Sequence, residues 1–278
     1  MNPFSVKTVV DKPLVFAQIS DSHLFAEVEG LHHGHNVFAN LTSVLTNISV
    51  NKDISFIVFT GDLTQDHSEQ SYQLFVDCVN YCNIKLPIYF LAGNHDEITL
   101  LDKYFSSPPF NSNKVINLAT WQLQLIDSKS DTPAGYVSKE SLLALSRTID
   151  PNKHQVVMMH HNPIDVGYFI DKHGLKNQQD FWCVMNQYSN INAVACGHVH
   201  RAMQLTQPRK FLPSDEEYLA LNSEQQSSYL PVTLYTCPAT SIQFDPDIDS
   251  VAALPQGPGY RLFHLFDSGI LTSNVIYP

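Results

Sequence analysis

The feature that most constrains this chain is a series of short apolar segments that each run into a polar cluster. Ile54–Thr60, ISFIVFT, is β-branched and aromatic, as buried strands are, and GDLTQD begins directly after it. Leu86–Phe90, LPIYF, is followed in the same way by LAGNHDE. Burying an unpaired amide, imidazole or carboxylate is costly. These polar residues therefore either solvate a loop or carry out chemistry.

Helical patterns alternate with the apolar segments over the first two-thirds of the chain. This alternation of β and α predicts an α/β fold with a largely parallel sheet packed by helices. The last third, 232–276, reads as short strands broken by Pro and Gly. The periodicities predict strands at 14–20, 54–60, 86–90, 115–118, 121–126, 154–159 and 191–196, and helices at 36–50, 68–82, 138–149 and 175–188.

A chain of 278 residues is long enough for a sizeable core, and we expect one domain over 1–278. The one shift in composition is the polar segment 208–228, PRKFLPSDEEYLALNSEQQSS, between two strand-like segments. We interpret it as a surface loop insertion, with disorder as the alternative.

Charge and cysteine content restrict the classes of partner. The formal net charge of −11 repels nucleic-acid phosphates, so we expect no nucleic-acid partner, and a small phosphorylated substrate would need local positive charge, which metal ions supply. The five cysteines are an odd number without a CxxC pair, which indicates reduced thiols and a cytoplasmic protein. The amino terminus lacks a signal-peptide core, and no apolar run approaches the ~18 residues of a membrane span.

Polar clusters follow five of the predicted strands. In open α/β sheets the carboxyl ends of strands converge on the ligand crevice. One such residue would be an ordinary cap, but a series on successive strands indicates a site. Six of the thirteen histidines lie in these clusters, and a role in a substrate loop stays open for His32, His33 and His35. The clusters are Asp21/His23, Asp62, Asn94/His95/Asp96, His160/His161 and His198/His200.

The residue types in these clusters suit metal ions. Asp oxygen and His nitrogen bind Zn, Mn, Fe and Co, and the absence of cysteine argues against a structural zinc site. The ligands are too many for one metal, whereas two metals sharing a carboxylate, ~3.5–4 Å apart, would use them all in a phosphoryl displacement. Gly61, Gly93 and Gly197 each precede a candidate ligand, and we expect them to let the backbone turn there.

The motifs DSH, GDLTQD, GNHD, HHNP and GHVH resemble those of the calcineurin-like metallophosphoesterases. Within that superfamily ISDSHLF, GDLTQD, CGHVHR and GPGYR resemble bacterial class III 3′,5′-cyclic AMP phosphodiesterases, from about Leu14 to the carboxyl terminus. The resemblance implies a four-layer α/β/β/α sandwich with a dinuclear metal site at the carboxyl ends of the strands. Asn162 and Ala92 stand where the family often has Pro, and neither is an expected ligand.

The resemblance also implies roles for individual residues. The first metal would be bound by Asp21, His23 and His200, the second by Asn94, His160 and His198, and Asp62 would bridge them. His95 would act on the phosphate as general acid or charge stabiliser, and Asp96 would orient His95 or brace the loop. Catalysis is expected at Asp62, Asn94 and His95, and substrate contacts at His23, Asp62, Asn94, His95 and His200.

The implied activity is hydrolysis of 3′,5′-cyclic AMP, or a related cyclic nucleotide, to the 5′-monophosphate by hydroxide held between two metals. Fe and Mn are the expected metals, with Zn and Co as alternatives. Other phosphodiesterases, such as glycerophosphodiesterases, and phosphomonoesterases remain alternatives, as does a non-catalytic scaffold, although every expected ligand is present. Protein phosphatases carry GDxxDRG, which Gln65-Asp66-His67 does not match, and a nuclease would need a basic track. The sequence carries no signal for oligomeric state.

Overall fold

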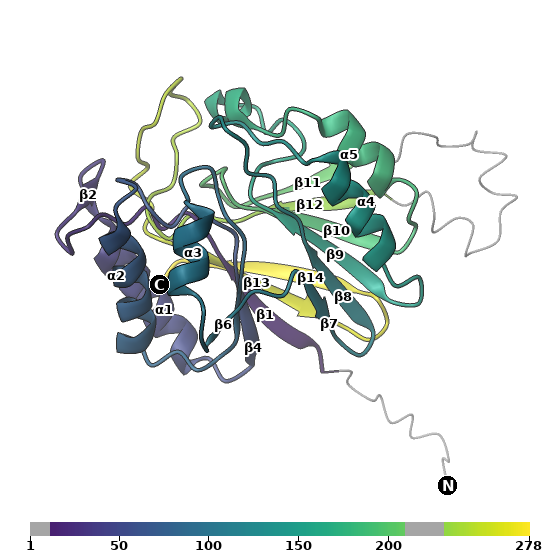
Figure 1. Cartoon of the computed structure of the whole chain (residues 1–278), viewed down its shortest axis with the longest axis horizontal. Coiled ribbons are helices and arrows are strands. Elements are labelled where there is room, and N and C mark those ends of the chain that lie inside the picture. Colours follow the sequence, from purple (N-terminus) through teal and green to yellow (C-terminus); the bar gives the residue numbers. More distant parts are fainter. Residues whose placement is uncertain (1–11, 209–230) are drawn as a thin grey trace, which may run out of the picture.

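Two six-stranded sheets form the centre of the structure, a computed structural model that describes residues 12–208 and 231–278 (Figure 1). The first sheet has the order β14 (Leu271–Ile276), β13 (Tyr260–Leu265), β1 (Leu14–Ile19), β4 (Ile54–Phe59), β5 (Ile88–Phe90), β6 (Phe110–Asn111). The second sheet has the order β11 (Met203–Gln207), β12 (Val232–Thr236), β10 (Ile191–Cys196), β9 (His154–Met159), β8 (Trp121–Leu125), β7 (Val115–Asn117).

The middle of each sheet is parallel. In the first sheet β1, β4, β5 and β6 run in one direction, and in the second sheet β8, β9, β10 and β12 do so. Antiparallel strands lie toward the edges: β13 and β14 in the first sheet, β7 and β11 in the second. The predicted largely parallel arrangement is confirmed, and it brings the carboxyl ends of successive strands to one edge of each sheet.

Helices cover the outer face of each sheet, on opposite sides of the molecule in Figure 1. The first sheet carries α1 (Val37–Val50), α2 (Glu69–Tyr81) and α3 (Ile98–Tyr104), and the second carries α4 (Lys139–Thr148) and α5 (Gln178–Met185). Asn36, Ser68 and Ser138 cap α1, α2 and α4, because each side-chain oxygen accepts a hydrogen bond from the backbone N–H three residues on. Only α5 is clearly shorter than its predicted range of 175–188.

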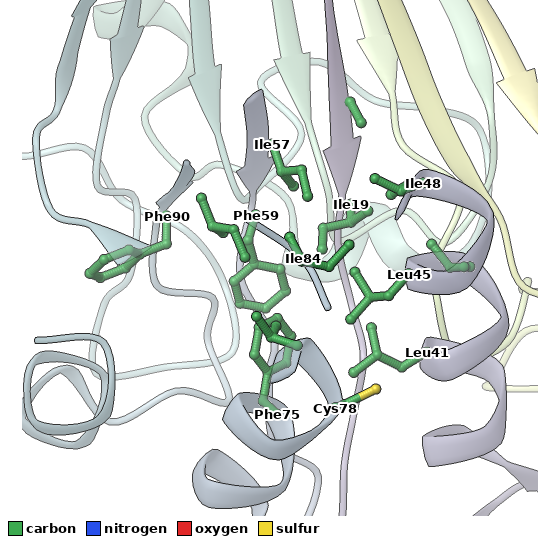
Figure 2. Close-up of a cluster of buried hydrophobic side chains, with 14 of the residues drawn as sticks. Ile19, Leu41, Leu45, Ile48, Ile57, Phe59, Phe75, Cys78, Ile84 and Phe90 are labelled. Carbon is green, nitrogen blue, oxygen red and sulfur yellow. The ribbon is translucent and has the colours of Figure 1, made fainter. Parts of the chain in front are cut away.

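Three hydrophobic cores separate these layers. Along β9, Val156 and Met158 point into the core between the two sheets, whereas Val157 and Met159 point into the core beneath α4 and α5. Figure 2 shows the equivalent core on the other side, where side chains of α1 and α2 pack on β1, β4 and β5. Strands that are buried on both faces read as continuous apolar runs, which explains the sequence pattern. The α/β/β/α sandwich is thereby confirmed.

Some elements do not follow from the sequence pattern. These are α3, the edge strands β6 and β11, the 3-10 turn η1 (Phe169–His173) and a small hairpin, β2 (Leu31–His32) and β3 (His35–Asn36). The hairpin turns through His33 at φ 46° and Gly34 at φ 84°. Asn-Gly and Asp-Gly are the usual signals for such a turn, so His-Gly is easily missed.

The proposed insertion at 208–228 lies outside the described residues apart from Pro208. The strands on either side of it, β11 and β12, pair at Gln207 and Val232. Val232 is the first residue of β12, so the segment joins the sheet at the amino-terminal end of that strand. No helix in the described parts of the chain is long and apolar enough to cross a membrane.

Candidate metal centre

The predicted ligands meet where strands of both sheets end. They follow β1, β4 and β5 in the first sheet and β9 and β10 in the second. The six Asp and His ligands are buried, with exposed fractions from 0% for Asp21 and His160 to 5% for His198, whereas Asn94 and His95 are half-buried. The structure therefore brings together every residue that the sequence places in the site, and leaves Asn94 and His95 on its accessible side.

Left-handed backbone aims many of these side chains. Asp21, His23, Asp62, His198 and His200 have φ between 45° and 64°, a region that few residues other than Gly adopt and in which Asp and His are enriched. Such conformations cost on the order of 1–3 kcal/mol each and persist only where the surroundings hold them. Here the N–H of Asp21 donates to the carbonyl of Gly61 over 2.8 Å.

The three glycines that precede candidate ligands, Gly61, Gly93 and Gly197, do not all have the turning role predicted from the sequence. Only Gly61 has a positive φ, 96°, so the expected turning role holds there and not at the others. A Cβ atom on Gly93 would lie 2.1 Å from Oδ1 of Asp62. Gly93 is therefore required because two loops approach each other closely, and the ligand residues themselves make the turns.

Asp21, His23 and His200 form the first ligand group. Nε2 of His23 lies 3.1 Å from Nε2 of His200, which in turn is 3.5 Å from Oδ1 of Asp21. Both Nδ1 atoms face oxygen acceptors, Gln65 Oε1 and the Ile242 carbonyl, each at 2.8 Å. These partners assign the ring protons to Nδ1, so the two facing Nε2 atoms carry lone pairs. Two lone pairs that point at each other suit a cation between them.

The second group that the sequence predicts is Asn94, His160 and His198. The structure places His160 and His198 close together, with His161 beside them and Asn94 next to His160. Oδ1 of Asn94 lies 3.2 Å from Nε2 of His160, whose Nδ1 donates to the Thr60 carbonyl over 2.7 Å. Nε2 of His198 is buried and has no hydrogen-bond partner within the described ranges. The orientation of His160 by its Nδ1–H bond to a backbone carbonyl is typical of a metal ligand.

Asp62 lies between the two groups. Its Oδ2 is 3.3 Å from Nε2 of His160 and 3.7 Å from Nε2 of His23. Its Oδ1 accepts the backbone N–H of His95 over 2.9 Å, which fixes the carboxylate. One oxygen atom thus faces both groups, as a bridging ligand must.

Burial shifts the pKa values of these groups, toward the metal-binding form for three histidines and away from it for Asp21. Burial lowers the pKa of His23 and His198 well below the usual histidine range, and that of His200 to about 3. These imidazoles are therefore neutral at neutral pH and keep their lone pairs. Burial raises the pKa of the Asp21 carboxyl to about 7.

Asp62 and His160 behave as an ion pair. Burial disfavours both charges, but the attraction between them raises the pKa of His160 to about 9 and holds the pKa of Asp62 well below its usual range. The proton on His160 therefore lies between His160 and Asp62, and a metal ion bound by both side chains would have to replace it. The donor set, its orphaned nitrogen and this charge pattern fit a pair of transition-metal ions.

Asp96 braces the site. Its carboxylate accepts the backbone N–H groups of Asp62, Leu63 and Gly93, each over 2.8 Å. It therefore ties the loop after β4 to the loop after β5, and of the two roles weighed from the sequence the contacts match this one.

The remaining histidines of the region divide into two kinds. His161 has both ring nitrogens in contact with oxygen, Ser128 Oγ at 2.9 Å and the Pro133 carbonyl at 3.3 Å, so it is less available as a ligand than His160. His32 packs flat on His23 with ring centroids 5.2 Å apart, so the β2–β3 hairpin reaches the site.

Two residues that no sequence pattern singles out lie beside the centre. Nζ of Lys129 donates to the Asn94 carbonyl over 3.0 Å, and Nδ1 of His67 lies 2.9 Å from the His95 carbonyl. Lys129 follows β8, which runs parallel to β9 and therefore ends at the same edge. His67 follows GDLTQD directly, and this position next to a predicted cluster is the signal that could have identified it.

An α/β/β/α sandwich with Asp, Asn and His ligands at the carboxyl ends of both sheets defines the class of metallophosphoesterases. Residues 14–202, more than half of the chain, match the calcineurin-like phosphoesterase family. The chain belongs to that family.

Named relatives cover nearly the whole chain. A protein of Colwellia psychrerythraea, named probable cyclic nucleotide phosphodiesterase, is 60% identical over 266 residues, 96% of this chain and 95% of the relative. The 3′,5′-cyclic adenosine monophosphate phosphodiesterase CpdA of Vibrio vulnificus is 28% identical, over 99% of this chain and 94% of the relative. A solved dimetal phosphatase from Danio rerio superposes with a TM-score of 0.60 at 12% identity, covering 92% and 94% of the two chains, which shows similarity of fold.

Proposed function

We propose that this chain is a metal-dependent phosphodiesterase that hydrolyses 3′,5′-cyclic AMP, or a related cyclic nucleotide, to the 5′-monophosphate. The observation that carries the proposal is the position of Asp62, whose Oδ2 lies within 3.7 Å of ligand nitrogens in both groups. The relatives from Colwellia psychrerythraea and Vibrio vulnificus, named for cyclic nucleotide hydrolysis, support the choice of substrate.

The two ligand groups would hold two metal ions, with Asp62 common to both. Fe and Mn suit these nitrogen and oxygen donors, and Zn and Co are alternatives. When bound, the metals would supply Lewis-acid polarisation of the phosphoryl oxygens and activation of water at neutral pH. The ligands would be Asp21, His23, His200 and Asp62 for one metal, and Asn94, His160, His198 and Asp62 for the other.

The chain's own residues would orient the phosphate and protonate the leaving group. Hydrolysis adds water across the bond between phosphorus and the 3′ oxygen, so that oxygen needs a proton as it leaves. His95 would donate this proton, a role supported by the hydrogen bond from its backbone N–H to Asp62 and by the edge-on packing of its ring against His23 at 4.9 Å. His23, Asp62, Asn94 and His200 would position the phosphate oxygens, and Asn94 and His95 would stabilise charge on them.

The first test is hydrolysis by metal-stripped protein reconstituted with Mn or Fe. The substrates are 3′,5′-cyclic AMP, a glycerophosphodiester, an aryl phosphodiester and 5′-AMP. We expect turnover of cyclic AMP to 5′-AMP, its loss in Asn94→Ala, and its retention in His264→Ala, a histidine that pairs with Val15 at the amino-terminal end of β1. Turnover of the aryl diester without turnover of cyclic AMP would remove the cyclic nucleotide from the proposal.

The role of His95 has its own test. An alkoxide leaving group needs a proton, whereas a nitrophenolate does not. His95→Ala should therefore lower kcat for cyclic AMP by about 10²–10⁴-fold, and much less for an aryl diester with a nitrophenyl leaving group. Equal losses with both substrates would instead assign charge stabilisation to His95.

A further inference from the structure

A cavity of about 440 Å³ lies beside the candidate metal centre, and most of its lining residues have no role in the mechanism proposed above. Asn94 and His95 form part of its wall, so the cavity is continuous with the place where the phosphate would react. Its volume falls in the range of small-molecule sites, ~300–1,000 Å³. The other lining residues are His67, Glu97, Lys129, Ser130, Asp131, Thr132 and Pro133.

The positive charge of this cavity is at its inner end. Lys129 is half-buried, and its Nζ donates to the backbone carbonyl of Asn94 over 3.0 Å. It is the one lysine or arginine in the lining, in a protein with a net charge of −11. An anionic group bound next to Asn94 would therefore lie close to the ammonium group of Lys129.

The negative charges of the cavity are at its rim. Glu97 and Asp131 are exposed, and neither side chain forms an ion pair with another described residue. A carboxylate only accepts hydrogen bonds, so this rim suits an occupant that carries N–H or O–H donors. It repels a second phosphate group.

His67 is an exposed residue of the cavity wall whose ring stacks on that of His95. Its backbone has φ 56°, and its ring lies parallel to that of His95 at 5.5 Å, with an interplanar angle of 4°. The contact of Nδ1 with the His95 carbonyl leaves Nε2 without a hydrogen bond to any described residue. The wall thus presents one further polar atom to an occupant.

We propose that this cavity binds the nucleoside part of a nucleoside 3′,5′-cyclic monophosphate, an inference that rests on the proposed function. Lys129 lies toward the single phosphate charge, and Glu97 and Asp131 accept hydrogen bonds from the sugar hydroxyl and the exocyclic amine of adenine. His67 lines the passage between them. The acidic rim rejects oligonucleotides and nucleoside polyphosphates, because these would place additional phosphates beside the carboxylates.

The test compares two substrates in the metal-loaded protein, 3′,5′-cyclic AMP and an aryl phosphodiester that lacks a nucleoside. The variants are Asp131→Asn and Glu97→Gln, with Glu140→Gln, an exposed carboxylate in the first turn of α4, as control. Each cavity variant should lower the ratio of kcat/KM for cyclic AMP to that for the aryl diester about tenfold, since one charge-assisted hydrogen bond is lost. Glu140→Gln should keep the ratio.

A binding measurement accompanies the kinetics. Calorimetric titration of the metal-loaded protein with 5′-AMP should give a Kd about tenfold weaker in Asp131→Asn than in wild type. His67→Asn, which tolerates the positive φ, should also weaken 5′-AMP binding.

The outcomes separate the cavity from the proposed function. If wild type hydrolyses cyclic AMP and the cavity variants keep both the substrate ratio and the 5′-AMP affinity, the nucleoside lies elsewhere and the inference is overturned. A cavity variant that lowers the hydrolysis of both substrates equally, with unchanged affinity for 5′-AMP, overturns the inference as well. If wild type hydrolyses only the aryl diester, the proposed function fails and the nucleoside assignment falls with it.

Discussion

The two sheets contribute different chemistry to the candidate centre. The first sheet supplies every candidate oxygen ligand, Asp21, Asp62 and Asn94, together with His23, whereas the candidate ligands of the second sheet are imidazoles alone. The negative charge that attracts metal ions thus comes from one half of the molecule. The other half would complete the coordination with imidazole nitrogen, after His160 has lost its proton. Neither sheet holds a full ligand set, so the centre exists only where the two are packed correctly.

Arg261 helps to hold the two halves in register. It lies on β13 in the first sheet, is 4% exposed, and donates to the carbonyls of Thr236 and Met203 in the second sheet over 2.9–3.1 Å. A guanidinium with several donors in fixed directions can join backbone groups in this way. The motif GPGYR, which contributed to the family resemblance without a role, therefore includes a link between the sheets.

The largest effect should come from removing the shared charge of the first sheet. Asp62→Asn keeps the shape but lacks the negative charge that faces both groups. We expect activity to fall by about 10³-fold and the metal content after reconstitution to drop, as measured by kinetics and elemental analysis. A variant that kept both metals and full activity would show that charge from Asp62 is not required.

The second prediction concerns the ion pair between Asp62, after β4 of the first sheet, and His160, after β9 of the second sheet. In metal-free protein at pH 7, His160→Ala leaves Asp62 buried without its partner and should lower the free energy of unfolding by about 3 kcal/mol, as measured by urea denaturation. Adding Asp62→Asn to this variant should recover much of the loss. Additive losses in the double variant would mean that the pair is not coupled.

A third and smaller effect concerns the support within the first sheet. Asp96→Asn replaces a carboxylate that accepts three backbone N–H groups by an amide that cannot accept all three. We expect metal affinity to fall 10–100-fold, with kcat of the metal-saturated enzyme unchanged, as changes behind metal ligands do. A shift in kcat of cyclic AMP hydrolysis with no change in affinity would instead place Asp96 in the chemical step.

The smallest effect is a dependence on pH. Because the pKa of His160 is raised to about 9, the metal-free protein holds a proton there that a metal must displace. Metal affinity should rise about tenfold per pH unit between pH 7 and 9, with about one proton released, as measured by calorimetry in buffers of different ionisation enthalpy. The same shift stabilises the metal-free fold fully below about pH 6.5, and this contribution is lost as pH rises through about 9.

The sequence predicts the oxygen and imidazole ligands because strand ends are visible as the last apolar residue of a buried run. Asp62 and His160 are found in this way without knowing which strands are neighbours. Lys129 is not, because its place depends on β8 lying beside β9 in the second sheet. His67 and the β2–β3 hairpin are missed for another reason: their positions depend on backbone at positive φ, which histidine adopts without an obvious signal.

The left-handed backbone of Asp21, His23, Asp62, His198 and His200 has a consequence for protein engineering. At each position a residue must both bind a metal and tolerate φ near +50°, and a β-branched side chain fails the second condition whatever its chemistry. A graft of this centre onto another scaffold would have to reproduce these turns along with the side chains. Screens for altered metal preference at these positions should therefore be rich in Asn, Asp and His, which meet the conformational condition before chemistry selects among them.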